Sequence, residues 1–139
     1  MTYGEIKEKI RDLGFEENST MKEYQTIVKN AVQRALQFLF DDVVIELKGY
    51  YKRELSTEEK PWVPVRPEPI TDDTPDERVL ELPDNIIELA PLLASYYVWL
   101  EDDNVKATLY WNAYDAHKRE IINACYADVR GTIIGGVGW

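Results

Sequence analysis

A short amphipathic pattern opens the chain. Thr2 and Glu5 stand at the spacing of a capping box, in which each side chain bonds the backbone N–H of the other residue. Apolar residues then recur at helical intervals until Gly14, at Ile6, Ile10 and Leu13. The pattern therefore predicts a first helix over about residues 3–13.

A longer apolar stripe follows a second capping box, which pairs Thr20 with Glu23. Its members recur every three or four residues, as on one face of an amphipathic helix: Tyr24, Ile27, Val28, Ala31, Val32, Ala35, Leu36 and Leu39. We therefore expect a second helix that begins at this box and runs at least to Leu39.

The stretch after Phe40 supports two interpretations. Val43, Val44 and Ile45 are β-branched in succession and Gly49 interrupts any helix, which favours a strand. The same stretch also continues the apolar stripe of the second helix, at Val43, Leu47, Tyr50 and Tyr51. We favour the strand, and a helix is the alternative over residues 43–55.

The composition changes between residues 56 and 83, which hold six of the seven prolines. Proline fixes φ, lacks an amide donor and biases the preceding residue to extended geometry. We therefore expect an extended excursion or short β-hairpin within residues 43–83, with an edge strand around residues 78–82. Four of its apolar side chains need a surface to lie on, either their own bundle or a neighbour, and we favour a contact with a neighbouring subunit or another partner: Trp62, Val63, Val65 and Ile70.

Two more helices are predicted after Pro83. Asp84 can cap a helix that is apolar nearly all round to residue 100, so we expect a central helix, which Pro91 either kinks or begins. The last helix should cover about residues 105–127, with a buried side formed by Leu109, Trp111, Ala113, Ala116, Ile121 and Ile122. The chain is thus expected to be mainly α, a four-helix bundle in a single domain over residues 1–129.

Charge and composition exclude several classes of partner. The 139 residues are 45% hydrophobic and carry a formal net charge of −10, so we expect a folded domain without affinity for phosphate backbones or anionic lipid. The longest apolar stretch, residues 86–100, is shorter than a membrane span and contains Glu88 and Pro91. A single cysteine, Cys125, and the absence of a secretory leader favour a reducing, cytoplasmic setting.

Residues that could carry catalysis are few and far apart. His117 and Cys125 stand about two helical turns apart, roughly 12 Å, which is too far for a dyad or a shared metal. No glycine-rich phosphate loop lies between a strand and a helix. Three acidic pairs lack the spacing of a calcium loop and are expected to cap helices and bind water: Asp41–Asp42, Asp72–Asp73 and Asp102–Asp103. We expect no enzyme, cofactor or metal; the enzymatic alternative is a carboxylate site around Glu101, Asp102 and Asp103.

Residues 130–139, RGTIIGGVGW, string large apolar side chains on four glycines. A terminal segment that stays in water is usually polar, so this composition favours an arm that binds a partner. We expect it to be extended and to order on that partner through Thr132, Ile133, Ile134, Val137 and Trp139.

The segment RPEPITDDTPDERVLELPDNIIELAPLLASYYVWLEDDNVKATLYWNAYDAHKREIINA, residues 66–124, joins the central apolar helix to the long last one. It resembles the C-terminal half of the head–tail connector (adaptor or head-completion) proteins of tailed bacteriophages and prophages. The opening, MTYGEIKEKIRDLGF, is similar to the short first helix of these proteins. The likeness is weakest over residues 43–70, where longer relatives carry a larger β-rich insertion.

The resemblance implies a connector-type bundle without catalytic activity. Its subunits would form a ring, typically twelvefold, that joins the portal to the tail and extends the DNA channel. The implied partners are the portal protein, on which residues 130–139 would dock, a tail or head-completion protein and further copies of the chain. DNA would pass through without specific binding, no membrane would be involved, and the protein would move from the host cytoplasm into the virion. The alternative is an acidic helical partner-binding or regulatory protein of phage origin.

Overall fold

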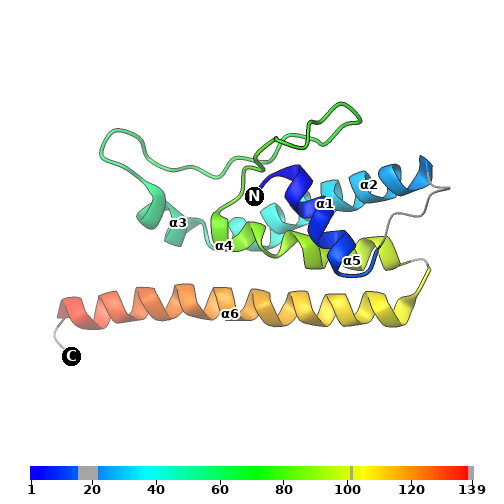
Figure 1. The fold of residues 1–139 in the computed structure, drawn as a ribbon. Coiled ribbons are helices and arrows are strands. Elements are labelled where there is room, and N and C mark those ends of the chain that lie inside the picture. The colour runs from blue at the N-terminus through cyan, green and yellow to red at the C-terminus, as the bar shows by residue number, and fades with distance from the viewer. Residues whose placement is uncertain (16–21, 101, 138–139) are drawn as a thin grey trace.

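The computed structural model describes residues 1–15, 22–100 and 102–137 and consists mainly of helices (Figure 1). They follow one another as α1 (Tyr3–Asp12), α2 (Lys22–Leu39), the π-helix η1 (Phe40–Val44), α3 (Lys48–Leu55), α4 (Asp84–Ile87), α5 (Ala90–Trp99) and α6 (Asn104–Val137). These described ranges hold no strand, only an isolated antiparallel bridge between Thr2 and Val79. The predicted mainly α class is confirmed.

Helix α1 begins at the capping box expected from the sequence. Glu5 N donates to Thr2 Oγ1 at 3.2 Å, and Thr2 N donates to Glu5 Oε1 at 3.3 Å. The chain leaves the helix through Gly14, whose φ of 114° is a conformation that favours glycine. The first predicted helix is therefore confirmed, whereas Thr20 of the second capping box lies outside the described residues.

The strand predicted over residues 43–55 is wrong, because the chain stays helical there. Ile45 N donates to Phe40 O at 3.1 Å and closes the π turn of η1, which leads into α3. Phe40, Val43 and Val44 are all buried. β-Branched residues lose only about 0.7 kcal/mol or less in a helix, whereas burying one such side chain contributes about 1.5–3 kcal/mol. Tertiary packing therefore outweighs the local preference.

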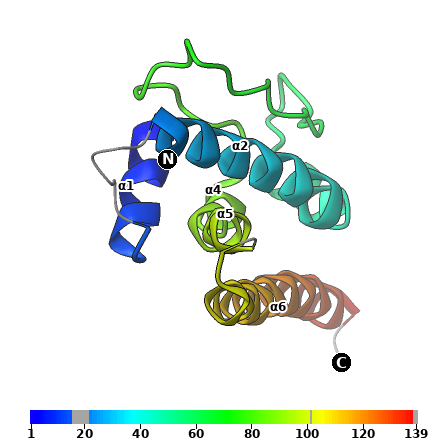
Figure 2. The ribbon, with the colours of Figure 1, turned by 90° about the vertical axis from the view of Figure 1, so that its right-hand side faces the viewer.

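Helix α5 occupies the centre of the molecule. Figure 2 shows it with α1 and α2 on one side and α6 on the opposite side. Ala90, Leu93 and Ala94 of α5 have no exposed surface. Pro91 lies in the first turn, where its missing N–H breaks no helical hydrogen bond. The sequence thus correctly predicted a central helix here, with Pro91 in its first turn as one of two alternatives. The single helix capped by Asp84 is wrong, because α4 ends at Ile87 before α5 begins and its N-cap is Pro83, without a side-chain cap.

Helix α6 is an outer layer that is covered on one side only (Figures 1 and 2). Among its described side chains, Ala107, Tyr114 and Cys125 are buried and form one stripe. Leu109 and Ala116 are exposed, so the burial predicted for them is wrong. A helix with a neighbour on one side has room for one stripe, and the other members of the predicted buried side are half-buried: Trp111, Ala113, Ile121 and Ile122.

The extended conformation predicted for the C-terminal arm is also wrong over residues 130–137, because α6 continues through Val137. Adding a residue to an existing helix requires no new nucleation step, so the helix can pass through Gly131, Gly135 and Gly136 despite their low propensity. The docking role of this segment stays a prediction. Trp139 lies outside the described residues.

Candidate protein interface

Residues 56–83 follow a path without helix or strand, and side chains of α2 and η1 hold this path in place. Gln33 Oε1 accepts from Ile70 N at 2.6 Å, and Gln37 Nε2 donates to Pro67 O at 3.0 Å. Arg66 Nη2 also donates to Asp41 Oδ1 at 2.5 Å, a charged bond that raises the pKa of the guanidinium. These contacts, rather than a hairpin, determine the shape of the segment.

The edge strand predicted around residues 78–82 is reduced to the single bridge at Val79. Two backbone bonds flank this bridge: Tyr3 N donates to Arg78 O at 2.9 Å, and Leu80 N donates to Met1 O at 3.1 Å. Helix α1 already begins at Tyr3, so the first segment of the chain leaves the extended conformation directly after the bridge. The excursion therefore pairs with the first residues of the chain only briefly.

Four residues of this segment were predicted to contact a partner, and the structure places them differently. Ile70 is buried in the core of its own chain, so its assignment to a partner contact is wrong. Trp62 is half-buried, with its ring centroid 5.7 Å from that of Tyr51. Val63 and Val65 are 59% and 62% exposed. Only these two valines offer most of their surface to another molecule.

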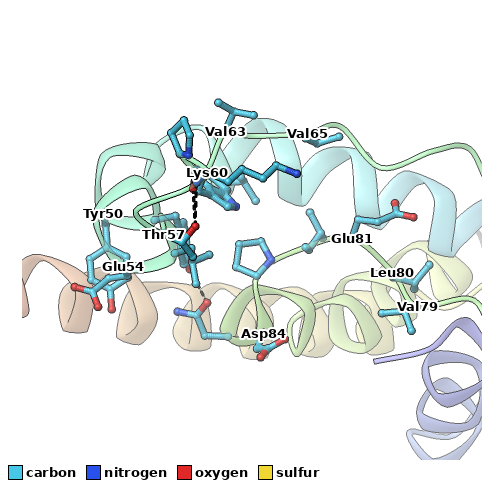
Figure 3. A pocket seen from close by; sticks show the side chains of 18 of the residues that line it. Tyr50, Glu54, Thr57, Lys60, Val63, Val65, Val79, Leu80, Glu81 and Asp84 are labelled. Carbon is cyan, nitrogen blue, oxygen red and sulfur yellow. Dashed lines mark hydrogen bonds between the residues drawn. The ribbon is translucent and has the colours of Figure 1, made fainter.

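Val63 and Val65 form part of a groove of about 840 Å³ between α3, residues 61–65 and residues 79–85 (Figure 3). Leu55 and Val79 line it as well and are likewise exposed. Four of the eight large apolar side chains that are exposed in the described ranges thus lie in one place. Gathered apolar surface of this kind is typical of an interaction site, whereas scattered apolar side chains are ordinary.

The sequence did not predict Leu55 or Val79 as interface residues. Leu55 was not considered as an interface residue because a strand is favoured over residues 43–55. Val79 was not considered because an edge strand is expected around residues 78–82. The two residues lie 24 positions apart in the sequence and face one groove only because residues 56–83 return to α4. No local pattern could indicate that return.

Charged residues at the groove are mostly acidic. Glu54, Glu81 and Asp84 line it, against one basic side chain, Lys60. Glu54 pairs with Arg53 of the same chain in an exposed ion pair of the kind that contributes little to stability. Glu81 pairs with Arg78, whose side chain is mostly buried and also donates to the carbonyl oxygens of Glu68 and Pro69. The groove thus combines apolar walls with an acidic rim, a lining that suits an apolar segment with a positive charge.

The polar group at the floor of the groove is the Tyr51 hydroxyl, which is held in a hydrogen bond. Tyr51 OH donates to Asn85 Oδ1 at 2.6 Å and joins α3 to α4. Burial raises the pKa of the Tyr51 hydroxyl well above its usual value, so the group stays neutral and cannot serve as a base near neutral pH. The arrangement is suited to binding, not to proton transfer.

Gln33→Ala should loosen the segment without unfolding the helices. The change leaves the partly buried Ile70 N–H without its acceptor, a loss of about 1–3 kcal/mol that falls on residues 66–72. We expect faster hydrogen exchange at those amides and an unchanged helical circular dichroism spectrum. Gln25→Ala, on an exposed position of the same helix, is the control. Equal exchange in the two variants would show that Gln33 does not hold the segment.

The residues predicted to form the docking arm lie at the end of α6. Thr132, Ile133, Ile134 and Val137 belong to this helix, but their side chains, like Trp139, lie outside the described part of the molecule. Whether they meet a portal protein therefore stays a prediction.

Of the acidic pairs predicted to cap helices and bind water, the last one provides a cap, whereas Asp42 and Asp72 bond other side chains instead. Asp103 Oδ1 accepts from Val105 N and Lys106 N at the start of α6, each at 3.1 Å, which confirms its capping role. Asp42 Oδ2 accepts from Tyr114 OH at 3.2 Å and Lys118 Nζ at 3.0 Å and so joins η1 to α6.

His117 is exposed with Glu120 4.0 Å away, and Cys125 is buried. No group of three metal-ligating side chains occurs in the described ranges. None of the helices in those ranges has the length and apolar character needed to cross a bilayer. A comparison of the chain with protein-family models, with curated proteins and with solved structures finds no match.

Proposed function

We propose that the chain is a structural subunit of a head–tail connector of a tailed bacteriophage. In this role it joins further copies of itself in a ring between portal and tail, around the DNA channel, and performs no chemistry. The observation that carries the proposal is the groove of Leu55, Val63, Val65 and Val79, an unfilled apolar surface on an otherwise acidic protein. Such a surface favours a stable protein partner over a soluble substrate.

Two further features support this function. The chain is mainly helical, with α1, α2 and α6 around α5, an arrangement compatible with a connector-type bundle, and the sequence of residues 66–124 resembles that family. A net charge of −10 suits a channel wall that must let DNA pass without holding it. The predicted partners are accordingly the portal, a tail or head-completion protein, and neighbouring copies.

An acidic helical partner-binding protein of phage origin is the second candidate. The acidic rim of the groove favours it, because such a rim can select a basic apolar segment of any protein. The two candidates differ in stoichiometry, since a ring subunit must bind the portal once for each portal subunit.

Co-sedimentation with the portal protein of the same phage genome tests the proposal. Purified portal rings are mixed with increasing amounts of the chain, and an unrelated ring protein of similar mass is the control. We expect binding that saturates near one chain per portal subunit. Absence of binding to the portal, or saturation at a single chain per ring, would contradict the connector function and favour the second candidate.

A further inference from the structure

The end of α6 extends away from the body of the molecule. Cys125 is buried, whereas Tyr126 and Ala127, the next two residues of α6, are exposed, and the helix continues from there to Val137. At 1.5 Å per residue, that continuation is about 18 Å long. Figure 1 shows the red end of α6 running past α3, and Figure 2 shows α6 on the side of α5 opposite residues 56–83. A straight helix in this position leads away from the groove of its own chain.

The sequence of this helical end is that of a groove-binding helix. The helical period places positions 130, 133, 134 and 137 on one face, and these positions hold Arg130, Ile133, Ile134 and Val137. The spacing i, i+3, i+4, i+7 is the anchor pattern of helices that bind apolar grooves. Asp128, the acidic residue between Cys125 and Val137, falls on the opposite side of the helix by the same period, so this face is apolar with one positive charge.

We propose that the end of α6 of one copy binds the groove of a second copy. Ile133, Ile134 and Val137 would cover the apolar walls, and Arg130 would meet the acidic rim. The charge of the two surfaces is complementary: three acidic residues and one lysine line the groove, and arginine is the charged residue on the face formed by positions 130, 133, 134 and 137. The three glycines make the free helical end weakly stable, so binding also stabilises its helical form.

The contact is heterologous, because each copy offers a groove at one place and a helical end at another. Contacts of this kind produce rings when the rotation closes and filaments when it does not. The inference rests on the proposed connector function, in which copies of the chain form a ring, and it identifies the two surfaces that bind each other. It replaces the extended portal-docking arm with a helical contact between subunits.

Three variants separate the two surfaces. Deletion of residues 131–139 removes the helical end and keeps the groove. Val63→Asp with Val65→Asp keeps the end and places two negative charges in an already acidic groove. The control is Val105→Asp with Leu109→Asp, a pair on the other half of α6 that is 73% and 63% exposed, comparable to the groove valines. All four substituted side chains are exposed, so each variant should fold as judged by circular dichroism.

Sedimentation velocity measures self-association of each variant alone and in mixtures. Each test variant should associate at least about tenfold more weakly than the wild type, whereas the control should match the wild type. An equimolar mixture of the deletion and the groove variant should form 1:1 dimers and nothing larger, because one intact groove then meets one intact helical end. This complementation is specific to a heterologous contact between these two surfaces.

Several results would overturn the inference. If the deletion and the groove variant both self-associate as strongly as the wild type, this contact does not hold the ring together, although a ring by another contact is still compatible with the result. A mixture that stays monomeric would also exclude the contact. If the deletion variant self-associates normally but no longer binds the portal, residues 130–139 bind the portal protein and not a second copy of the chain. Wild-type chains that never associate would exclude the contact, and the portal titration would then decide the connector function independently.

Discussion

Leu93→Ala is expected to lower the free energy of unfolding by about 2–5 kcal/mol. Leu93 lies in α5 and has no exposed surface, and α1, α2 and α6 surround this helix. Truncation removes apolar contacts and leaves a cavity that three neighbours cannot all close. Because a small domain is stable by only about 5–15 kcal/mol, the variant should lose a large part of its stability.

Leu109→Ala is the matched control for Leu93→Ala. The residue type and the helical setting are the same, but Leu109 is exposed on α6, so its truncation should change stability by no more than about 0.5 kcal/mol. Urea unfolding of both variants at neutral pH gives the comparison. Similar losses in the two variants would show that α6 is covered on its outer side or that α5 is not the centre of the core.

The protein should lose stability steeply above about pH 10, where an unfolded tyrosine loses its proton. Burial raises the pKa of both Tyr51 and Tyr114 above this value, and the nearby Asp42 carboxylate raises that of Tyr114 further. The folded state therefore keeps protons that the unfolded state releases, so their stabilising contribution is complete below pH 10 and is lost as pH rises beyond it. Each such tyrosine should lower the stability by about 1.4 kcal/mol per pH unit in that range.

Tyr51→Phe tests this pH dependence. The variant loses its hydrogen bond to Asn85, so it should be less stable at neutral pH, but its stability should fall less steeply above pH 10, by about 1.4 kcal/mol per unit. Urea unfolding at several pH values between 8 and 11, in steps of about one unit, measures both effects. An unchanged slope would show that Tyr51 titrates normally in the folded protein.

The sequence predicted those elements whose signals are local. The Thr2–Glu5 capping box and the first-turn Pro91 depend on backbone groups a few residues away, and both occur as expected. The apolar run of α5 also indicated its central position, since a helix that is apolar on all sides must be covered on all sides.

The remaining features depend on contacts between distant residues. Residues 43–55 hold β-branched side chains, yet their burial against the core makes them helical. Helix α6 carries apolar residues on more than one side, so periodicity alone could not show that the stripe of Tyr114, rather than that of Leu109, faces α5. Ile70 enters the core because Gln33 binds its amide, an interaction across 37 positions of sequence.

One wall of the candidate interface could be predicted from the sequence. The other wall could not, because it also depends on contacts between distant residues. Proline-rich composition indicated Val63 and Val65 as outward apolar residues, and their exposure agrees with this. The opposite wall and the acidic rim come from α3 and the approach to α4, which the sequence could not place beside them. The groove therefore exists only as a product of the fold.

Electron microscopy of the portal protein saturated with the wild-type chain tests the central claim most directly. The account predicts an added ring, coaxial with the portal, in which each portal subunit carries one copy of the chain and the end of each α6 contacts the groove of its neighbour. Portal rings without an added layer, in the presence of folded and excess chain, would contradict the connector function.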